Sequence, residues 1–209
     1  MKVIVIGATG SIGRLTVKNL LAEGHSVTAF ARRPDRAGIE HPDLTLRAGD
    51  ARDAAAVTAA IRGQDAVVIT LGAGASRRNK IRSEGTLAVI RAMQETGVRR
   101  LIVQSTLGAH ESWENLNFFW KYIMFGLLLA PAHRDHELQE TLVSASGLDW
   151  TIVRPSAFTD GQATGQFATG FGPQKRGLSL KIPRADVADF LKRQLVDKGH
   201  MHSAVGISN

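Results

Sequence analysis

The chain has 209 residues, a formal net charge of +7 and no cysteine. The absence of cysteine excludes disulfides, thiolate nucleophiles and zinc-thiolate sites. The length predicts one domain over residues 1–209 that can bury a sizeable core. The 26 lysines and arginines are dispersed along the chain, without a basic arm or recognition helix. We therefore expect an affinity for small anions and no nucleic-acid partner.

The chain begins with an apolar strand that leads directly into a glycine-rich turn. Residues 2–13 read K-V-I-V-I-G-A-T-G-S-I-G, and apolar residues continue at helical spacing after them. Glycine is needed where the backbone takes a positive φ or lies against a ligand. Gly7 suits the turn, Gly10 a close approach to a pyrophosphate, and Gly13 the packing of the helix on the strand. The segment predicts a dinucleotide-phosphate site at a helix start.

The residues after the second expected strand, 25–31, indicate which dinucleotide binds. Arg32, Arg33 and Arg36 stand where an NAD-binding domain places a carboxylate for the ribose 2′-hydroxyl. Arginine binds phosphate oxygens through charge-assisted hydrogen bonds, whereas Asp or Glu would repel a 2′-phosphate. We therefore predict NADP(H) as the cofactor, and the alternative interpretation is a solvated basic turn before Pro34.

The rest of the chain alternates strands with helices. The expected strands are 44–47, 66–71, 100–104 and 150–153, and the expected helices are 54–61, 79–96 and 134–146. This order predicts an α/β fold of the Rossmann type, a doubly wound parallel sheet with ligands at the carboxyl ends of its strands. No apolar run is long enough to span a membrane, and the phosphate loop begins too early for a cleaved leader, so we expect a cytoplasmic protein.

Residues 113–130 are rich in Trp, Phe, Leu and Met and follow the strand expected at 100–104. Such side chains stack on flat aromatic ligands, which predicts a small cap on the substrate side of the sheet. A dimer face or a core-packing lid explains the same composition equally well. The sequence therefore leaves both a monomer and a homodimer open.

Together these motifs resemble those of the atypical short-chain dehydrogenase/reductases, and most closely the biliverdin reductase B and flavin reductase-like branch, with NmrA-like proteins as neighbours. The motifs are G-A-T-G-S-I-G, R-R-P-D-R, A-G-D at 48–50, L-G at 71–72, S-E-G at 83–85, D-H at 135–136 and S-G-L-D-W-T-I-V-R-P at 146–155. They are spread over nearly the whole chain.

The resemblance implies that NADPH is bound by the glycine-rich loop and by residues at the strand ends. The implied cofactor-binding residues are Gly7, Thr9, Gly10, Ser11, Ile12, Gly13, Arg32, Arg33, Arg36, Asp50, Ala51, Leu71, Gly72, Pro155 and Ser156. Ser105 and Thr106 are the candidate catalytic residues beside the nicotinamide. Thr106 could donate a hydrogen bond to the acceptor, or it could only close the turn at the strand end.

The chain departs from the wider superfamily at the catalytic tyrosine and lysine, which lie four residues apart on one helix. If Glu140 is the acidic residue that commonly follows that lysine by four, His136 occupies the lysine position and Ala132 the tyrosine position. The only tyrosine, Tyr122, lies among apolar residues, which is typical of a packed aromatic ring with a hydrated hydroxyl. An ordinary alcohol dehydrogenase is therefore disfavoured.

The remaining chemistry is hydride transfer that needs little help with a proton. Flavins, quinones and linear tetrapyrroles accept hydride into a conjugated system, so the protein mainly has to bind and align them. We predict an NADPH-dependent reductase of such acceptors, most plausibly flavin, and the alternative is an NmrA-like regulatory protein that senses NADP(H) without catalysis. His133 and His136 lack an evident third ligand, so no metal is expected. His200 and His202 are expected in a C-terminal tail without a role.

Overall fold

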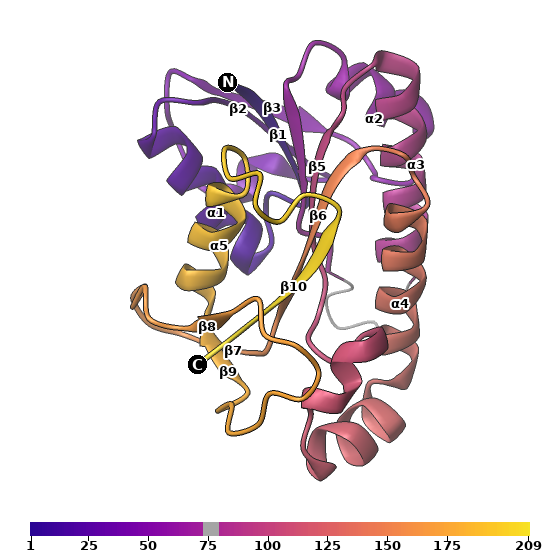
Figure 1. The fold of residues 1–209 in the computed structure, drawn as a ribbon. Helices are drawn as coiled ribbons and strands as arrows, with labels where there is room; N and C mark the ends of the chain where they lie inside the picture. Colours follow the sequence, from indigo (N-terminus) through magenta and orange to yellow (C-terminus); the bar gives the residue numbers. More distant parts are fainter. Residues whose placement is uncertain (73–79) are drawn as a thin grey trace.

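The computed structural model describes residues 1–72 and 80–209, and its strands form one large twisted sheet with helices on both faces (Figure 1). The strand order is β3-β2-β1-β4-β5-β6-β10-β8. Its strands are β1 (Lys2–Ile6), β2 (Ser26–Ala31), β3 (Leu44–Ala48), β4 (Ala66–Ile69), β5 (Arg100–Gln104), β6 (Asp149–Pro155), β8 (Ala168–Thr169) and β10 (Ser203–Ser208). All neighbouring strands are parallel except β8, which is antiparallel to β10.

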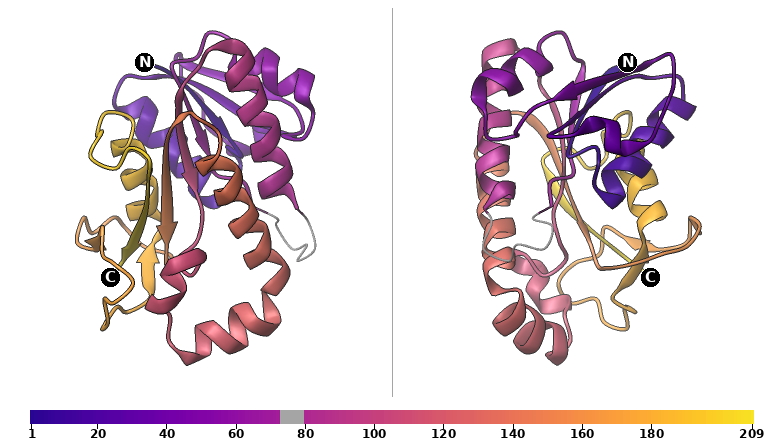
Figure 2. Two further views of the ribbon diagram at one scale, coloured as in Figure 1. Left: turned by 45° about the vertical axis from the view of Figure 1, so that its right-hand side comes forward. Right: turned by 180° about the vertical axis from the view of Figure 1, so that it is seen from behind.

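The helices form the two outer layers, and this arrangement confirms the predicted doubly wound α/β fold. They are α1 (Ser11–Ala22), α2 (Ala54–Ile61), α3 (Ile81–Thr96), α4 (Ala130–Ser144) and α5 (Arg184–Arg193). Helices α1 and α5 cover one face, and α2, α3 and α4 cover the other (Figure 2). Because both faces are covered, the central strands are continuous apolar runs, and every residue of Ala66–Ile69 is buried.

A smaller set of elements lies at the carboxyl ends of the strands. It comprises three short helices, η1 (Pro34–Ala37), η2 (His110–Asn115) and the π-helical η3 (Phe119–Leu128), and a two-stranded parallel ribbon of β7 (Ala157–Thr159) and β9 (Lys181–Pro183). In Figure 1 these elements, apart from η1, lie at the lower end of the molecule. Within 1–72 and 80–209, no helix combines the length and apolarity that a membrane span requires.

Most expected elements are present, with shifted ends. The strand at 100–104 and the helix at 54–61 have the predicted bounds. Helix α4 begins at Ala130 rather than at residue 134, because Pro131 lies in its first turn, where a missing backbone N–H costs no intrahelical hydrogen bond. The helix start expected at Asn79 lies outside the described residues.

The C-terminal residues are not the expected free tail. Strand β10 pairs with β6 on one side and with β8 on the other, and its Val205 and Ile207 are buried in the core. His202 precedes the strand, donates its backbone N–H to the Trp150 carbonyl oxygen at 2.7 Å, and packs its ring edge-on against the indole. The expectation of a tail is therefore wrong, since a six-residue strand with only two large apolar residues has a weak sequence signal.

Candidate functional site

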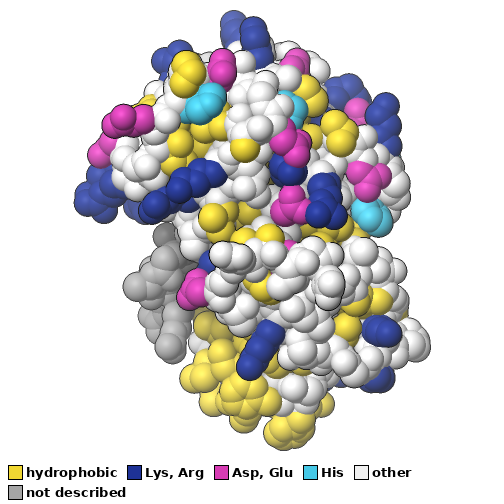
Figure 3. Space-filling model, turned by 90° about the vertical axis from the view of Figure 1, so that its left-hand side faces the viewer, with side chains coloured by type: hydrophobic (Ala, Val, Ile, Leu, Met, Phe, Trp, Pro, Cys, Tyr) yellow, Lys and Arg dark blue, Asp and Glu magenta, His cyan; other side chains and the backbone are white. Residues whose placement is uncertain are grey.

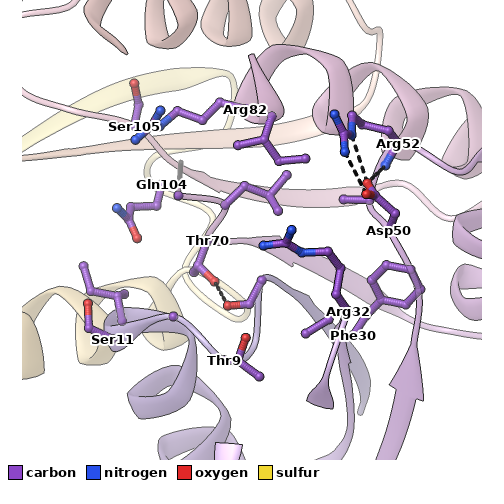
Figure 4. Close-up of a pocket in the computed structure, with 18 of the residues that line it drawn as sticks. Thr9, Ser11, Phe30, Arg32, Asp50, Arg52, Thr70, Arg82, Gln104 and Ser105 are labelled. Atoms are coloured by element: carbon purple, nitrogen blue, oxygen red, sulfur yellow. Dashed lines mark hydrogen bonds and ion pairs between the residues drawn. The ribbon is translucent and has the colours of Figure 1, made fainter. Parts of the chain in front are cut away.

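A cavity of about 450 Å³ opens at the carboxyl ends of the parallel strands (Figure 4). Five consecutive strands of the sheet contribute to its wall, each through a residue at or just beyond its end: Gly7, Arg32, Asp50, Leu71 and Ser105. The strand order reverses between β1 and β4, and in doubly wound sheets a crevice at this switch point is the usual ligand site. The fold therefore brings distant predicted residues to one place.

The glycine-rich loop forms the floor of this cavity. Gly7 has a φ of +92°, and a Cβ there would lie 2.7 Å from the Thr70 carbonyl oxygen. A Cβ on Gly13 would collide with the Gly7 carbonyl oxygen, so α1 can pack this closely against the loop only because residue 13 is glycine. No side chain of the described residues caps α1, and Gly10, Ser11 and Ile12 at its start line the cavity. These backbone N–H groups are a ready site for the pyrophosphate of a dinucleotide.

The end of the cavity beside β2 and β3 is basic. Asp50 accepts hydrogen bonds from Arg52 Nη2 at 2.9 Å and Nε at 3.1 Å, and these bonds lower the pKa of Asp50 to about 2. Arg32 lines the cavity below this pair, and its guanidinium points away from the Phe30 ring toward the centre of the view in Figure 4. The ionised Asp50 neutralises Arg52, which leaves the Arg32 guanidinium available to bind an anion.

The structure brings together twelve of the residues expected at the site. Those that line the cavity are Gly7, Thr9, Gly10, Ser11, Ile12, Arg32, Asp50, Ala51, Leu71, Gly72, Ser105 and Thr106. Ser156 lines a second cavity that adjoins this one. Neither cavity is lined by Gly13, Arg33, Arg36 or Pro155. Gly13 acts through helix packing, and Arg33 and Arg36 are exposed at η1. Their predicted contacts with the cofactor remain predictions.

Sequence reasoning missed several residues that line the cavity, chiefly Arg52, Arg82, Gln104 and Phe158. Arg52 stands two residues after Asp50, a spacing that allows the observed side-chain and backbone bonds to one carboxylate. Gln104 is the residue immediately before the predicted Ser105. Arg82 and Phe158 carry no local signal, because they come from the first turn of α3 and from β7 and meet the other residues only in the folded chain.

A second cavity, of about 330 Å³, adjoins the first and shares Arg82, Thr106, His136 and Phe158 with it. We call it the acceptor cavity. Its other lining residues are mostly apolar or aromatic: Leu107, Leu116, Trp120, Phe125, Leu129, Ala132, His133, Ser156, Ala157, Leu180 and Arg184. Four of them belong to the segment 113–130, so that segment covers the cavity with one face, as expected of a cap.

The other face of this segment is exposed. Phe118 and Leu127 each keep 71% of their surface accessible, and Tyr122 keeps 58%. Tyr122 packs against Phe118 with ring centroids 4.9 Å apart and lines neither cavity. In Figure 3, hydrophobic side chains gather at the lower end of the molecule, where η3 lies in Figure 1. Tyr122 therefore lies away from both cavities.

The residues between the two cavities carry the polar groups. The Ser105 hydroxyl lies 3.5 Å from His136 Nδ1, and both side chains are buried. Burial, together with the positive charge of Arg82, holds the pKa of His136 well below its usual range, so the imidazole is neutral at pH 7. The Thr106 hydroxyl donates to the Leu107 carbonyl oxygen at 3.3 Å. Among the described residues no group of three or more His, Asp or Glu could hold a metal ion.

A buried ion pair fixes α4, which carries Ala132 and His136, against the end of β6. Arg154 donates through Nη2 to Glu140 Oε2 at 2.6 Å and through Nη1 to Glu111 Oε1 at 2.5 Å. The side chains of Arg154 and Glu140 are 5% and 2% exposed. Two carboxylates around one guanidinium hold both α4 and η2 on the strand. Glu140 is therefore a positioning residue for the helix that borders both cavities.

Known proteins resemble this chain in sequence or in structure over most of its length. The UPF0659 protein YMR090W of Saccharomyces cerevisiae is 29% identical over 94% of this chain and 87% of its own. The uncharacterized sugar epimerase YhfK of Bacillus subtilis is 28% identical over 100% and 94%. The solved structure of ChuY, an anaerobilin reductase from Escherichia coli O157:H7, has a TM-score of 0.82 and 28% identity over 99% and 96% of the two chains.

The match to a family model agrees with the geometry. The model of NAD(P)H-binding proteins matches residues 7–198, a range that begins in the glycine-rich loop and reaches beyond α5. The resemblance to short-chain dehydrogenase/reductases is confirmed at the level of this family and of the Rossmann fold that NAD(P)-binding oxidoreductases share. The phosphate loop, the basic end of the cavity and the family match lead to one conclusion: this chain is a member of the NAD(P)H-binding family.

Proposed function

We propose that the protein is an NADPH-dependent reductase that transfers hydride to a flat conjugated acceptor such as a flavin, a quinone or a tetrapyrrole. The observation that carries the proposal is the junction of the two cavities at Thr106 and His136. If a dinucleotide lies along the strand ends with its adenosine ribose near Arg32, its nicotinamide ring would lie at this junction. A flat ligand in the acceptor cavity would meet it at the same point, which is the alignment that hydride transfer requires.

The choice of NADPH rests on the basic end of the first cavity. Arg32 faces the space that a ribose 2′-phosphate would occupy, and the carboxylate of Asp50 is already held by Arg52. NADPH supplies the hydride, while the glycine-rich loop and the start of α1 would bind its pyrophosphate. This chain's task is then to fix the geometry and to exclude water from the junction.

The residues at the tyrosine and lysine positions favour an acceptor that spreads charge within itself. Ala132 lines the acceptor cavity, where its methyl side chain leaves space for a ligand but cannot donate a proton. His136 is neutral at pH 7. A conjugated acceptor can take hydride first and a proton from solvent later. The ChuY relative, described as an anaerobilin reductase, supports a tetrapyrrole among these acceptors. Sugar epimerisation, suggested by the name of the Bacillus relative, fits an apolar cavity poorly.

The decisive experiment is stopped-flow oxidation of NADPH with FMN, riboflavin, a quinone and biliverdin as acceptors. We expect single-turnover reduction of at least one of them without added metal. NADPH that carries deuterium on the transferred face should show a primary kinetic isotope effect. If no acceptor oxidises NADPH above background at saturating cofactor, the reductase proposal is wrong.

A second candidate is a non-catalytic regulator that reports NADP(H) binding to a protein partner. The exposed apolar face of η3, with Phe118, Phe119 and Leu127, favours it, since contiguous exposed apolar surface often marks an interaction site. This surface lies on the far side of the cap from the acceptor cavity. The regulator hypothesis predicts tight NADP(H) binding, an inert acceptor panel and a partner whose affinity depends on the nucleotide.

A further inference from the structure

Arg82 brings a largely buried positive charge to the junction of the two cavities. It lies in the first turn of α3, lines both cavities, and its side chain is only 14% exposed. In Figure 4 it extends toward Ser105, away from the basic end at Arg32 and Arg52. The position is therefore that of the acceptor and the nicotinamide rather than that of the 2′-phosphate.

The donors of Arg82 are only partly satisfied within the described part of the chain. Its Nη1 forms an ion pair with Asp135 Oδ2 at 3.6 Å, a distance longer than a hydrogen bond. Asp135 instead accepts from the Ser83 hydroxyl at 2.5 Å and from two backbone N–H groups at the start of α3. Nε and Nη1 of Arg82 have no hydrogen-bond partner among residues 1–72 and 80–209. Such unpaired buried donors are costly unless a ligand completes them.

A second arginine lines the acceptor cavity. Arg184, at the start of α5, stacks on Phe158 with its guanidinium carbon 5.5 Å from the ring centroid. Its Nη1 donates to the exposed Asp160 at 2.6 Å, and its buried Nε has no partner in the described residues. The acceptor cavity thus combines apolar walls with two guanidinium groups that retain free donors, and no carboxylate of the described residues lines it.

We infer that the acceptor carries an anionic group, a carboxylate or a phosphate, and that Arg82 is the specificity-determining residue that binds it, with Arg184 as a second contact. The inference rests on the proposed function, because it assigns a substrate class to the same site. Apolar walls select the flat ring, and guanidinium donors select the acid group attached to it. Neutral acceptors of the same shape then bind more weakly.

The test uses two pairs of acceptors that differ only in the acid group. FMN and riboflavin share one ring system and differ by a phosphate, whereas biliverdin and its dimethyl ester differ by two carboxylates. Affinities are measured without turnover, by quenching of tryptophan fluorescence in the presence of NADP⁺, since Trp120 lines the cavity. Variants Arg82→Gln, Arg82→Lys and Arg184→Gln are compared with Arg62→Gln, whose side chain is 72% exposed and distant from the site.

We expect the anionic member of at least one pair to bind about 10-fold or more tightly than its neutral partner, the size of a hydrogen bond to a charged group. A preference within the flavin pair would identify phosphate as the recognised group, and a preference within the biliverdin pair would identify carboxylate. Arg82→Gln should reduce the preference below about 3-fold, and Arg184→Gln should reduce it less. Arg82→Lys should retain most of it, and Arg62→Gln all of it.

Equal affinities within both pairs in the wild-type protein would overturn the inference. So would an Arg82→Gln variant that loses NADPH affinity but keeps its acceptor preference, because Arg82 would then serve the cofactor. A clear anionic preference in binding, combined with no NADPH oxidation for any acceptor, would support the inference and contradict the reductase proposal. The experiment therefore distinguishes a failure of this inference from a failure of the proposed reductase function.

Discussion

At the scale of single residues, the site is defined by how each charge is or is not paired. Asp50 and Arg52 neutralise each other through a bidentate contact. Arg32 faces the cavity, and Arg82 at the other end has an ion pair with Asp135 at 3.6 Å and two nitrogens without a hydrogen-bond partner in the described residues. Guanidinium donors of this kind are available for ligand anions.

The first prediction concerns Arg32. We expect wild-type protein to bind NADPH at least about 10-fold more tightly than NADH, because one charge-assisted contact contributes about 1.5–3 kcal/mol. In Arg32→Ala most of this preference should disappear while the dissociation constant for NADH stays within about 2-fold, as measured by calorimetry. Arg62→Ala is the matched control, since Arg62 is 72% exposed and lines neither cavity. An unchanged preference for NADPH in Arg32→Ala would show that the 2′-phosphate lies elsewhere.

The second prediction concerns the buried His136. Its pKa is depressed in the folded state, so below pH 6.5 the unfolded chain binds more protons and stability falls as the pH decreases. The slope contributed by one such group is up to about 1.4 kcal/mol per pH unit. Urea unfolding between pH 5 and pH 8 should show a shallower slope in His136→Gln than in the wild type. Identical slopes in the wild type and in His136→Gln would refute the assignment.

At the scale of elements, the first strand, its loop and α1 form one unit in which backbone groups rather than side chains make the site. Gly10 precedes α1 and leaves its first N–H groups free of a side-chain cap in the described structure. Gly13 allows α1 to touch the Gly7 carbonyl. The anion site therefore depends on how closely a helix can approach a turn.

The third prediction tests this approach. In Gly13→Ala the new methyl group would collide with the Gly7 carbonyl oxygen and the Thr70 side chain, so the loop has to move. We expect a loss of about 1–3 kcal/mol of folding stability, the usual cost of overpacking, and at least about 10-fold weaker NADPH binding. Denaturant titration and calorimetry measure the two effects. Gly172→Ala, where a Cβ meets nothing within 4 Å, should change neither; unchanged binding in Gly13→Ala would contradict the role of the close contact.

At the scale of the whole molecule, residues from the far end of the chain complete the sheet behind the site. Strand β10 lies beside β6, and Ser156 donates its backbone N–H to the Ile207 carbonyl oxygen at 3.1 Å. The last strand thus supports the segment that leads from β6 into the acceptor cavity. Ile207 is fully buried in the cluster that also contains α1 and α5 residues.

The fourth prediction follows from this burial. Ile207→Ala should lower the free energy of unfolding by about 2–5 kcal/mol, because it removes buried methyl groups and leaves a cavity. Val196→Ala, at a position that is 72% exposed, should change it by less than about 0.5 kcal/mol. Urea denaturation provides the comparison. Similar small effects in both variants would mean that β10 contributes little to the core.

The sequence alone determined the Rossmann fold, the position of the phosphate loop and the basic strand end at Arg32. These features depend on residues that are neighbours along the chain, so their spacing is readable without a structure. Ser105 and Thr106 were proposed only through the resemblance to a known family, and their role remains a prediction. The segment 113–130 showed its aromatic composition but not which of its faces would line a cavity.

Tertiary structure alone decided the rest. Only folding places Arg82 from α3, His136 from α4 and Phe158 from β7 around one junction, since these residues are separated by tens of positions in sequence. It also decided that Arg52 neutralises Asp50, and that the weakly patterned β10 joins the sheet. The pairing of charges and the continuity of the two cavities depend on distances between elements. A one-dimensional pattern carries no such distances, because side-chain packing between helices and sheet sets them.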